Sequence, residues 1–78
     1  MIRFLRTRVD GTQEQIGTAR LVNGRVVFSD LPAVLTEELQ EFGILYNGKA
    51  FFPEDGQAFL DGLPAAYSGS IFRAEEVE

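Results

Sequence analysis

The chain has 78 residues, of which 45% are hydrophobic and none is cysteine or histidine, and its formal net charge at pH 7 is −5. This length fits one small domain, which buries only about 60% of the surface that its unfolded chain exposes. The lack of cysteine excludes disulfides and thiolate metal sites, and the lack of histidine removes the commonest general base and nitrogen ligand. Stability must therefore come from apolar burial, assisted by self-association where that occurs.

Neither a membrane span nor a secretion signal is predicted. No segment approaches the run of about 20 apolar residues that a spanning helix needs. The N-terminal MIRFLRTRVD has arginines spaced through it and lacks the apolar core and cleavage site of a signal peptide. We therefore expect a small acidic cytoplasmic protein, in the style of bacterial single-domain proteins, without a membrane partner.

Charge is distributed unevenly along the chain. Residues 1–25 hold five arginines and two acids, whereas residues 26–78 hold ten acids against Lys49 and Arg73. The basic front and the acidic back can attract each other within the fold, or present two different surfaces to partners.

Three strands are predicted before residue 30. Residues 2–9, 12–22 and 25–29 are separated by Asp10-Gly11 and Asn23-Gly24, dipeptides that are typical of two-residue hairpin turns. Treating both as two-residue loops pairs Leu5 with Ile16 and Val22 with Arg25. The register then collects one wholly apolar face, made of Ile2, Phe4, Ala19, Leu21, Val26 and Phe28. The opposite face is mixed and exposed to water, with Arg3, Leu5, Thr18, Arg20, Val22, Arg25 and Val27.

A helix is predicted over residues 32–42. Ser29 or Asp30 supplies a capping side chain, Pro32 suits the first turn, and Gly43 suits a left-handed residue at the C-terminal end. Apolar residues recur at helical spacing at positions 31, 34, 35, 39 and 42, which predicts a buried stripe.

A second hairpin is predicted around Asn47-Gly48. The pairing places three apolar residues on one face, Ile44, Tyr46 and Phe51, and three on the other, Leu45, Ala50 and Phe52. Because neither face is polar, we expect the hairpin to be covered on both sides, or on one side by a second subunit.

The remaining segment predicts a helix and a strand. Pro53-Glu54-Asp55-Gly56 begins a short helix, which Gly62 and Pro64 end. A last short strand follows at residues 71–74, and the acidic residues 75–78 are expected to fray. The fold prediction is a single small α+β domain spanning residues 1–78, in the order β-β-β-α-β-β-α-β: an antiparallel three-stranded meander and a second hairpin, packed with two short helices.

The sequence offers little catalytic chemistry. Its serines have no histidine to activate them, and Lys49 is the only lysine. Glu54, Asp55 and Asp61 are the candidate carboxylates for acid–base catalysis or a hard cation, but helix capping and solvation also account for them. The Ser68-Gly69-Ser70 run can hold an anion on its amides, although such a run before a strand is usually a bend. We predict no catalytic residue, cofactor or metal, and keep an enzyme using Glu54, Asp55 or Ser70 as an alternative.

Two surfaces are candidates for partner binding. The first is the hairpin, with Ile44, Tyr46, Phe51 and Phe52 as its candidate contact residues. The second is the mixed sheet face, where Arg3, Arg20 and Arg25 suit phosphates or an acidic partner. Against nucleic acid stand the net acidity and the lack of stacking aromatics on that face. Alternatively, these arginines pair with the acidic second half of the chain, and their stems cover apolar neighbours.

The function prediction is a non-catalytic domain that acts through protein–protein contacts, as a homodimer or an accessory subunit. It depends on the missing catalytic residues and on the surplus apolar surface in residues 44–52. The alternative is binding of nucleic acid or an acidic partner through the arginine-bearing sheet face.

Overall fold

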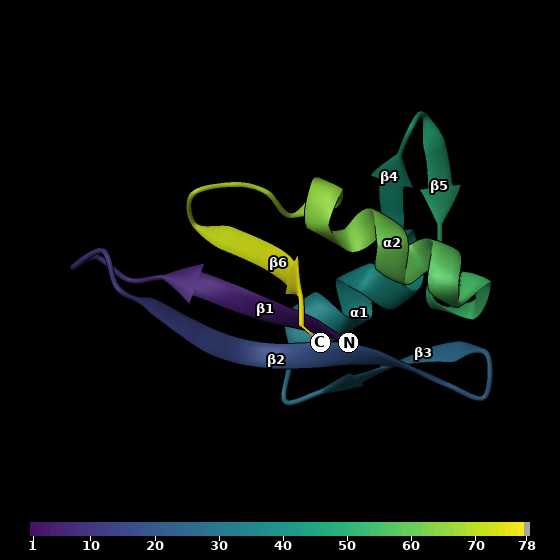
Figure 1. Ribbon diagram of the computed structural model, residues 1–78, viewed down its shortest axis with the longest axis horizontal. Coiled ribbons are helices and arrows are strands. Elements are labelled where there is room, and N and C mark those ends of the chain that lie inside the picture. The colour runs from purple at the N-terminus through teal and green to yellow at the C-terminus, as the bar shows by residue number, and fades with distance from the viewer. Residues whose placement is uncertain (78) are drawn as a thin grey trace.

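The computed structural model describes residues 1–77 and contains two sheets and two α-helices, as Figure 1 shows. Four strands form one antiparallel sheet in the order β3-β2-β1-β6: β1 (Ile2–Thr7), β2 (Gln13–Val22), β3 (Arg25–Ser29) and β6 (Phe72–Glu76). Strands β4 (Ile44–Tyr46) and β5 (Lys49–Phe51) form a separate antiparallel hairpin. The predicted α+β class and element order are confirmed.

The core lies between one face of the four-stranded sheet and helix α2 (Gln57–Ala66). This inner face contributes Phe4, and α2 contributes Phe59 and Leu63, all of them fully buried. Helix α1 (Ala33–Phe42) joins the same core through Leu39. The β4–β5 hairpin packs on α2 and projects from it on the side away from the sheet (Figure 1).

Both Asn-Gly turns form as the sequence predicts. Asn23 and Gly24 have φ of 53° and 77°, and Asn47 and Gly48 have φ of 53° and 74°. Two consecutive positive φ angles are the geometry that a two-residue type I′ turn requires. The predicted pairs beside these turns, Val22 with Arg25 and Tyr46 with Lys49, are confirmed.

The prediction of a two-residue turn at Asp10-Gly11 is wrong. The Arg8 N–H donates to the Thr12 carbonyl at 2.7 Å, so three residues form the loop, and Gly11 has φ of 89°. The Asp10 carboxylate holds this turn by accepting hydrogen bonds from the Thr12 N–H at 2.9 Å and the Thr12 hydroxyl at 2.6 Å.

A β-bulge absorbs the changed loop length. Phe4 still pairs with Gly17 as predicted, but Leu5 pairs with Gln15, so Ile16 is the extra residue. Ile16 packs against the core instead of facing water beside Leu5. The bulge thus moves one more apolar side chain into the core than strict alternation allows.

Two residues of the meander differ in burial from the predicted faces. Leu21 is 42% exposed, although its direct partner Val26 on the same inner face is buried. Leu5 is buried on the outer face, because β6 pairs with β1 and makes β1 an interior strand of the sheet.

The ends of α1 confirm one prediction and contradict another. Gly43 has φ of 65° and its N–H donates to the Leu39 carbonyl at 3.0 Å, so it ends the helix as expected. Neither Ser29 nor Asp30 caps the other end, where Pro32 occupies the N-cap position without a side-chain hydrogen bond. Asp30 instead has φ of 62°, which turns the chain between β3 and the helix.

The second helical segment is longer than predicted. Residues Pro53–Asp55 form a 3₁₀ turn, η1, and Gly56 with φ of 63° separates it from α2. Gly62 and Pro64 do not end α2, which continues to Ala66. Gly62 lies inside the helix because the hairpin packs directly on it: a Cβ there would lie 2.9 Å from the Ile44 Cδ1. Pro64 lies in the last turns, where the Tyr67 N–H still donates to the Leu63 carbonyl at 2.9 Å.

The C-terminal strand corrects the expectation that residues 75–78 fray. Strand β6 pairs with β1 as far as Ile2 and Glu76, and the Val77 N–H donates to the Met1 carbonyl at 2.8 Å. On its other side, the Ala74 N–H donates to the Tyr67 carbonyl at 2.8 Å. Acidic residues are held in this strand because an arginine lies opposite Glu75. Residue 78 lies outside the described residues.

Candidate functional site

Ion pairs occupy much of the arginine-bearing outer face of the sheet. Arg3 lies directly opposite Glu75 and forms an ion pair with it, and Arg73 lies 3.5 Å from the same carboxylate. Arg20 and Arg25 are exposed and form no ion pair with any other residue of the described chain. The intramolecular interpretation of the arginines therefore holds for Arg3, and leaves two of the three candidates available to solvent.

The tip of the β1–β2 hairpin holds a second ion-pair cluster. Arg6 and Arg8 both bind the Glu14 carboxylate, with Arg8 at 2.5 Å. Hydrogen bonds from Arg8 first, and from Arg6 second, lower the pKa of Glu14 below its ordinary value. Four of the six arginines are thus paired with carboxylates of the sheet.

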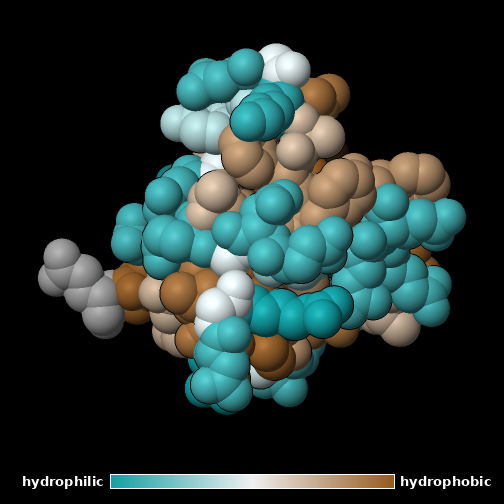
Figure 2. Space-filling view, turned by 90° about the vertical axis from the view of Figure 1, so that its right-hand side faces the viewer, coloured by the Kyte–Doolittle hydropathy of each residue, from teal (hydrophilic) through white to brown (hydrophobic). Residues whose placement is uncertain are grey.

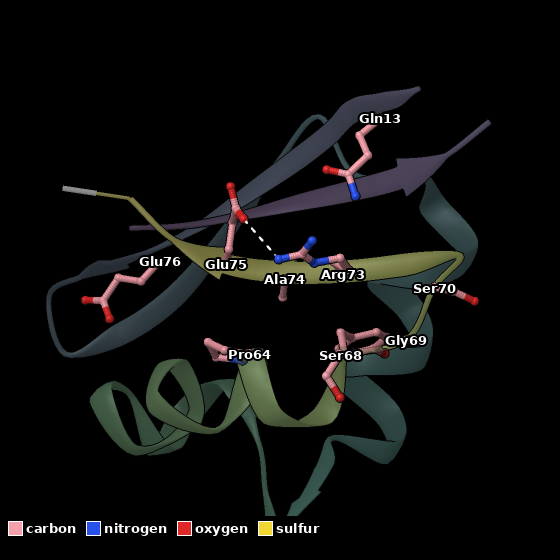
Figure 3. Close-up of a pocket in the computed structure, with 10 residues that line it drawn as sticks. Gln13, Pro64, Ser68, Gly69, Ser70, Arg73, Ala74, Glu75 and Glu76 are labelled. Atoms are coloured by element: carbon pink, nitrogen blue, oxygen red, sulfur yellow. Dashed lines mark ion pairs between the residues drawn. The ribbon is translucent and has the colours of Figure 1, made fainter. Parts of the chain in front are cut away.

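A hollow of about 700 Å³ lies between β6 and the end of α2 (Figure 3). It brings Ser68 and Ser70 near Arg73, but Ser70 points away from Arg73 and Glu75. Glu75 is engaged by arginines, and neither Glu54 nor Asp55 lines the hollow. The residues of the enzyme alternative are therefore not brought together.

The candidate carboxylates outside that hollow have local roles. Asp55 accepts a hydrogen bond from the Phe52 N–H at 2.7 Å, which confirms its capping interpretation. Asp61 accepts one from the Gln57 side chain at 2.8 Å. Across residues 1–77, no group of three or more Asp, Glu, His or Cys residues is placed to hold a metal ion.

Three of the four hairpin residues predicted to contact a partner face the protein's own core. Ile44 is 6% exposed, and it packs with Tyr46 on Gly62 of α2. Phe51 is half-buried against the core, with its ring centroid 6.3 Å from that of Tyr46. Phe52 is half-buried beside Gly43. The face that is free for a partner is the opposite one.

Apolar residues of α1, the helix that directly precedes the hairpin, are exposed as well. Leu45 is 72% exposed on the hairpin, and Phe42 and Val34 are 69% and 76% exposed on the helix. Figure 2 shows hydrophobic side chains at the molecular surface around the base of the hairpin. Helical spacing alone assigned Val34 and Phe42 to the buried stripe. Their position on the helix among Glu37, Glu38 and Glu41 indicates instead that they are exposed, since a helix face that carries three acids is solvated.

Val34 also borders a groove of about 240 Å³ between the start of α1 and the start of β6. The groove is lined by Pro32, Val34, Leu35, Glu38 and Phe72. Burial, and then the charge of Glu38, raise the pKa of the nearby Tyr67 phenol. We call Val34, Phe42, Leu45 and this groove the α1–hairpin surface.

The layer that carries the α1–hairpin surface is strongly acidic. Residues 30–66 hold seven acids and a single basic residue, Lys49. Within the described chain none of these acids forms an ion pair, because all the pairs that form join residues of the sheet and of the β1–β2 tip. The surface therefore combines exposed apolar side chains with uncompensated negative charge.

No family model, curated protein or solved structure matches the chain. In the part of the chain that the structure describes, neither helix has the length and apolar character needed to cross a membrane.

Proposed function

We propose that this protein is a non-catalytic interaction domain, which acts by presenting the α1–hairpin surface to another protein chain. It does so as one half of a homodimer or as an accessory subunit of a larger assembly. The observation that carries the proposal is the exposure of Val34, Phe42 and Leu45 on adjoining elements.

The exposure of these side chains is unfavourable for an isolated domain of this size. Full burial of a valine, leucine or phenylalanine side chain is worth about 1.5–3 kcal/mol. A chain of 78 residues buries a small core and has little stability in reserve. A partner that covers the α1–hairpin surface would remove this apolar area from water on association.

The chemistry of the other surfaces supports the same proposal. The large hollow between β6 and α2 offers Ser68 and Ser70 without a base to activate them. Asp55 is engaged in capping, and Glu75 is engaged by Arg3. These side chains therefore do not form the set of nucleophile, base and orienting group that hydrolysis requires.

Binding of nucleic acid or an acidic partner through the outer sheet face has less support. Arg20 and Arg25 form no ion pair within residues 1–77, but Arg3 is paired with Glu75. Salt-sensitive binding of a short DNA duplex or an RNA hairpin, lost in an Arg20→Gln/Arg25→Gln variant, would favour this alternative.

Sedimentation velocity and affinity capture test the interaction proposal together. The test variant is Phe42→Ser/Leu45→Ser, and the control is Val22→Ser/Val27→Ser, which removes two exposed apolar side chains from the outer sheet face. We expect the wild type either to dimerise with increasing concentration or to retain a partner that also binds when both proteins are purified. The test variant should lose this association and the control should keep it.

Two results together would overturn the proposal. The wild type would stay monomeric at every concentration, and every protein that it binds would also bind the Phe42→Ser/Leu45→Ser variant.

A further inference from the structure

We infer that the α1–hairpin surface binds a basic amphipathic helix of a different protein, rather than a second copy of this chain. The inference rests on the proposed function and specifies the chemistry of the partner.

The groove beside α1 has the composition that accepts a long basic side chain. Val34, Leu35 and Phe72 make its walls apolar, and Glu38 adds a carboxylate to its lining. Lysine and arginine bury their hydrocarbon stems along apolar surface while the charged group remains at the polar edge. A guanidinium or ammonium group at Glu38 would form a charge-assisted hydrogen bond there.

The spacing of the exposed residues on α1 suits a helix. Val34 and Phe42 are eight residues apart, which corresponds to about 12 Å along the helix axis. Apolar residues at positions i, i+4 and i+7 of a partner helix extend over about 10.5 Å, which is close to this distance. Leu45 is likewise exposed, on strand β4, which begins one residue after Gly43 ends α1.

Charge decides between a basic partner and a second copy of the chain. In a two-fold symmetric contact, the same patch of both protomers meets, so the patch of one protomer that carries Glu37, Glu38 and Glu41 would meet the same acidic patch of the other. Lys49 is the only basic residue of this layer, and like charges placed opposite each other are unfavourable. On the sheet of a second copy, Arg20 and Arg25 are the two arginines that form no ion pair within residues 1–77. A contact between them and the acids of α1 would be head-to-tail, and such a contact builds a ring or an open chain of copies rather than a two-fold dimer.

Three synthetic peptides of about 18 residues test the inference with the intact protein. The first has leucines at i, i+4 and i+7 flanked by lysines and arginines. The second has glutamate at every basic position, and the third has the composition of the first in a scrambled order. Fluorescence anisotropy measures binding at about 50 and 300 mM NaCl, since screening weakens exposed charge pairs over this range. Amide chemical shifts locate the bound peptide.

We expect the basic amphipathic peptide to bind about tenfold more tightly than either of the others, and to weaken at the higher salt concentration. Shifts should concentrate on residues 32–45 and on Phe72. A Glu37→Gln/Glu38→Gln/Glu41→Gln variant should lose about fivefold or more in affinity. The control variant Glu54→Gln/Asp61→Asn removes two acids of the same layer away from α1, and it should bind as the wild type does.

Equal binding of the basic and acidic peptides, or shifts confined to the outer sheet face, would overturn the inference. If the chain instead dimerises through Phe42 and Leu45 and binds no peptide, the inference fails while the proposed function stands. If it neither associates nor binds, both fail.

Discussion

At the scale of single residues, the Glu14 carboxylate makes stability depend on pH. Arg8 and Arg6 lower its pKa in the folded protein, so the folded state binds its proton less readily than the unfolded state does. The stabilisation is therefore present above the unfolded pKa and is lost as the pH falls through the folded pKa. An NMR titration should find the pKa of Glu14 below 4.5, and an Arg8→Gln variant should move it back toward that value. An unchanged pKa in the variant would show that the arginine contacts do not form in solution.

Gly62 shows how one residue sets the distance between two elements. An alanine usually stabilises a helix interior by about 1 kcal/mol relative to glycine. Here its Cβ would lie 2.9 Å from the Ile44 Cδ1 and 3.1 Å from the Tyr46 Cβ, so the buried Ile44 side chain must change its position and Tyr46 must shift slightly. We expect Gly62→Ala to lower the free energy of unfolding in urea by about 1–3 kcal/mol.

The matched control for Gly62→Ala is Gly69→Ala, because a Cβ at Gly69 meets its nearest neighbour at 3.6 Å. This control should change stability by less than about 0.5 kcal/mol. A stabilised Gly62→Ala protein would mean that the hairpin does not pack tightly on α2.

At the scale of elements, β6 completes the sheet that the N-terminal meander begins. Ala74 is buried on the inner face of the sheet. The backbone of β6 pairs with β1 on one side, and on the other side the Ala74 N–H donates to the Tyr67 carbonyl. We expect the Ala74 and Val77 amides to exchange with solvent at least about tenfold more slowly than in an unstructured peptide, since both donate hydrogen bonds. If both amides exchange at the rate of an unstructured peptide, then residues 74–77 do not form this strand, and the prediction of a frayed C-terminus is correct.

Local turn chemistry made most of this fold predictable. The two Asn-Gly turns and the glycine after α1 determine their own backbone geometry, so the registers and the helix end next to them could be derived from sequence. The Asp10-Gly11 turn was mispredicted because the Asp10 side chain binds Thr12 and stabilises a longer loop. Nothing in the alternation of the strands reveals the bulge that this loop requires.

The candidate surface was less predictable, because burial depends on which elements lie on either side. The hairpin pattern shows two apolar faces, but only the packing on Gly62 decides that Ile44 is inside and Leu45 outside. In the same way, the spacing of Val34 and Phe42 predicts an apolar stripe without saying whether the rest of the chain is long enough to cover it.

At the scale of the whole molecule, the layers differ in charge balance. Four of the six arginines form ion pairs with Glu14 or Glu75 of the sheet, whereas none of the seven acids in residues 30–66 forms an ion pair within residues 1–77. Charge that no intramolecular partner balances is available to direct association with a basic one. We therefore assign the stability of the fold to the sheet and its core, and propose that the α1–hairpin surface serves a partner.

The most direct test of this separation is the free energy of unfolding in urea of a Val34→Gln/Phe42→Gln/Leu45→Thr variant. If the three residues serve a partner, the variant should keep the wild-type value to within about 1.5 kcal/mol, since each is an exposed position. A Phe59→Ala variant, which opens a cavity in the core, calibrates the measurement with a loss of about 3–5 kcal/mol. A loss of more than about 3 kcal/mol in the triple variant would show that these side chains stabilise the fold itself, and would contradict the account.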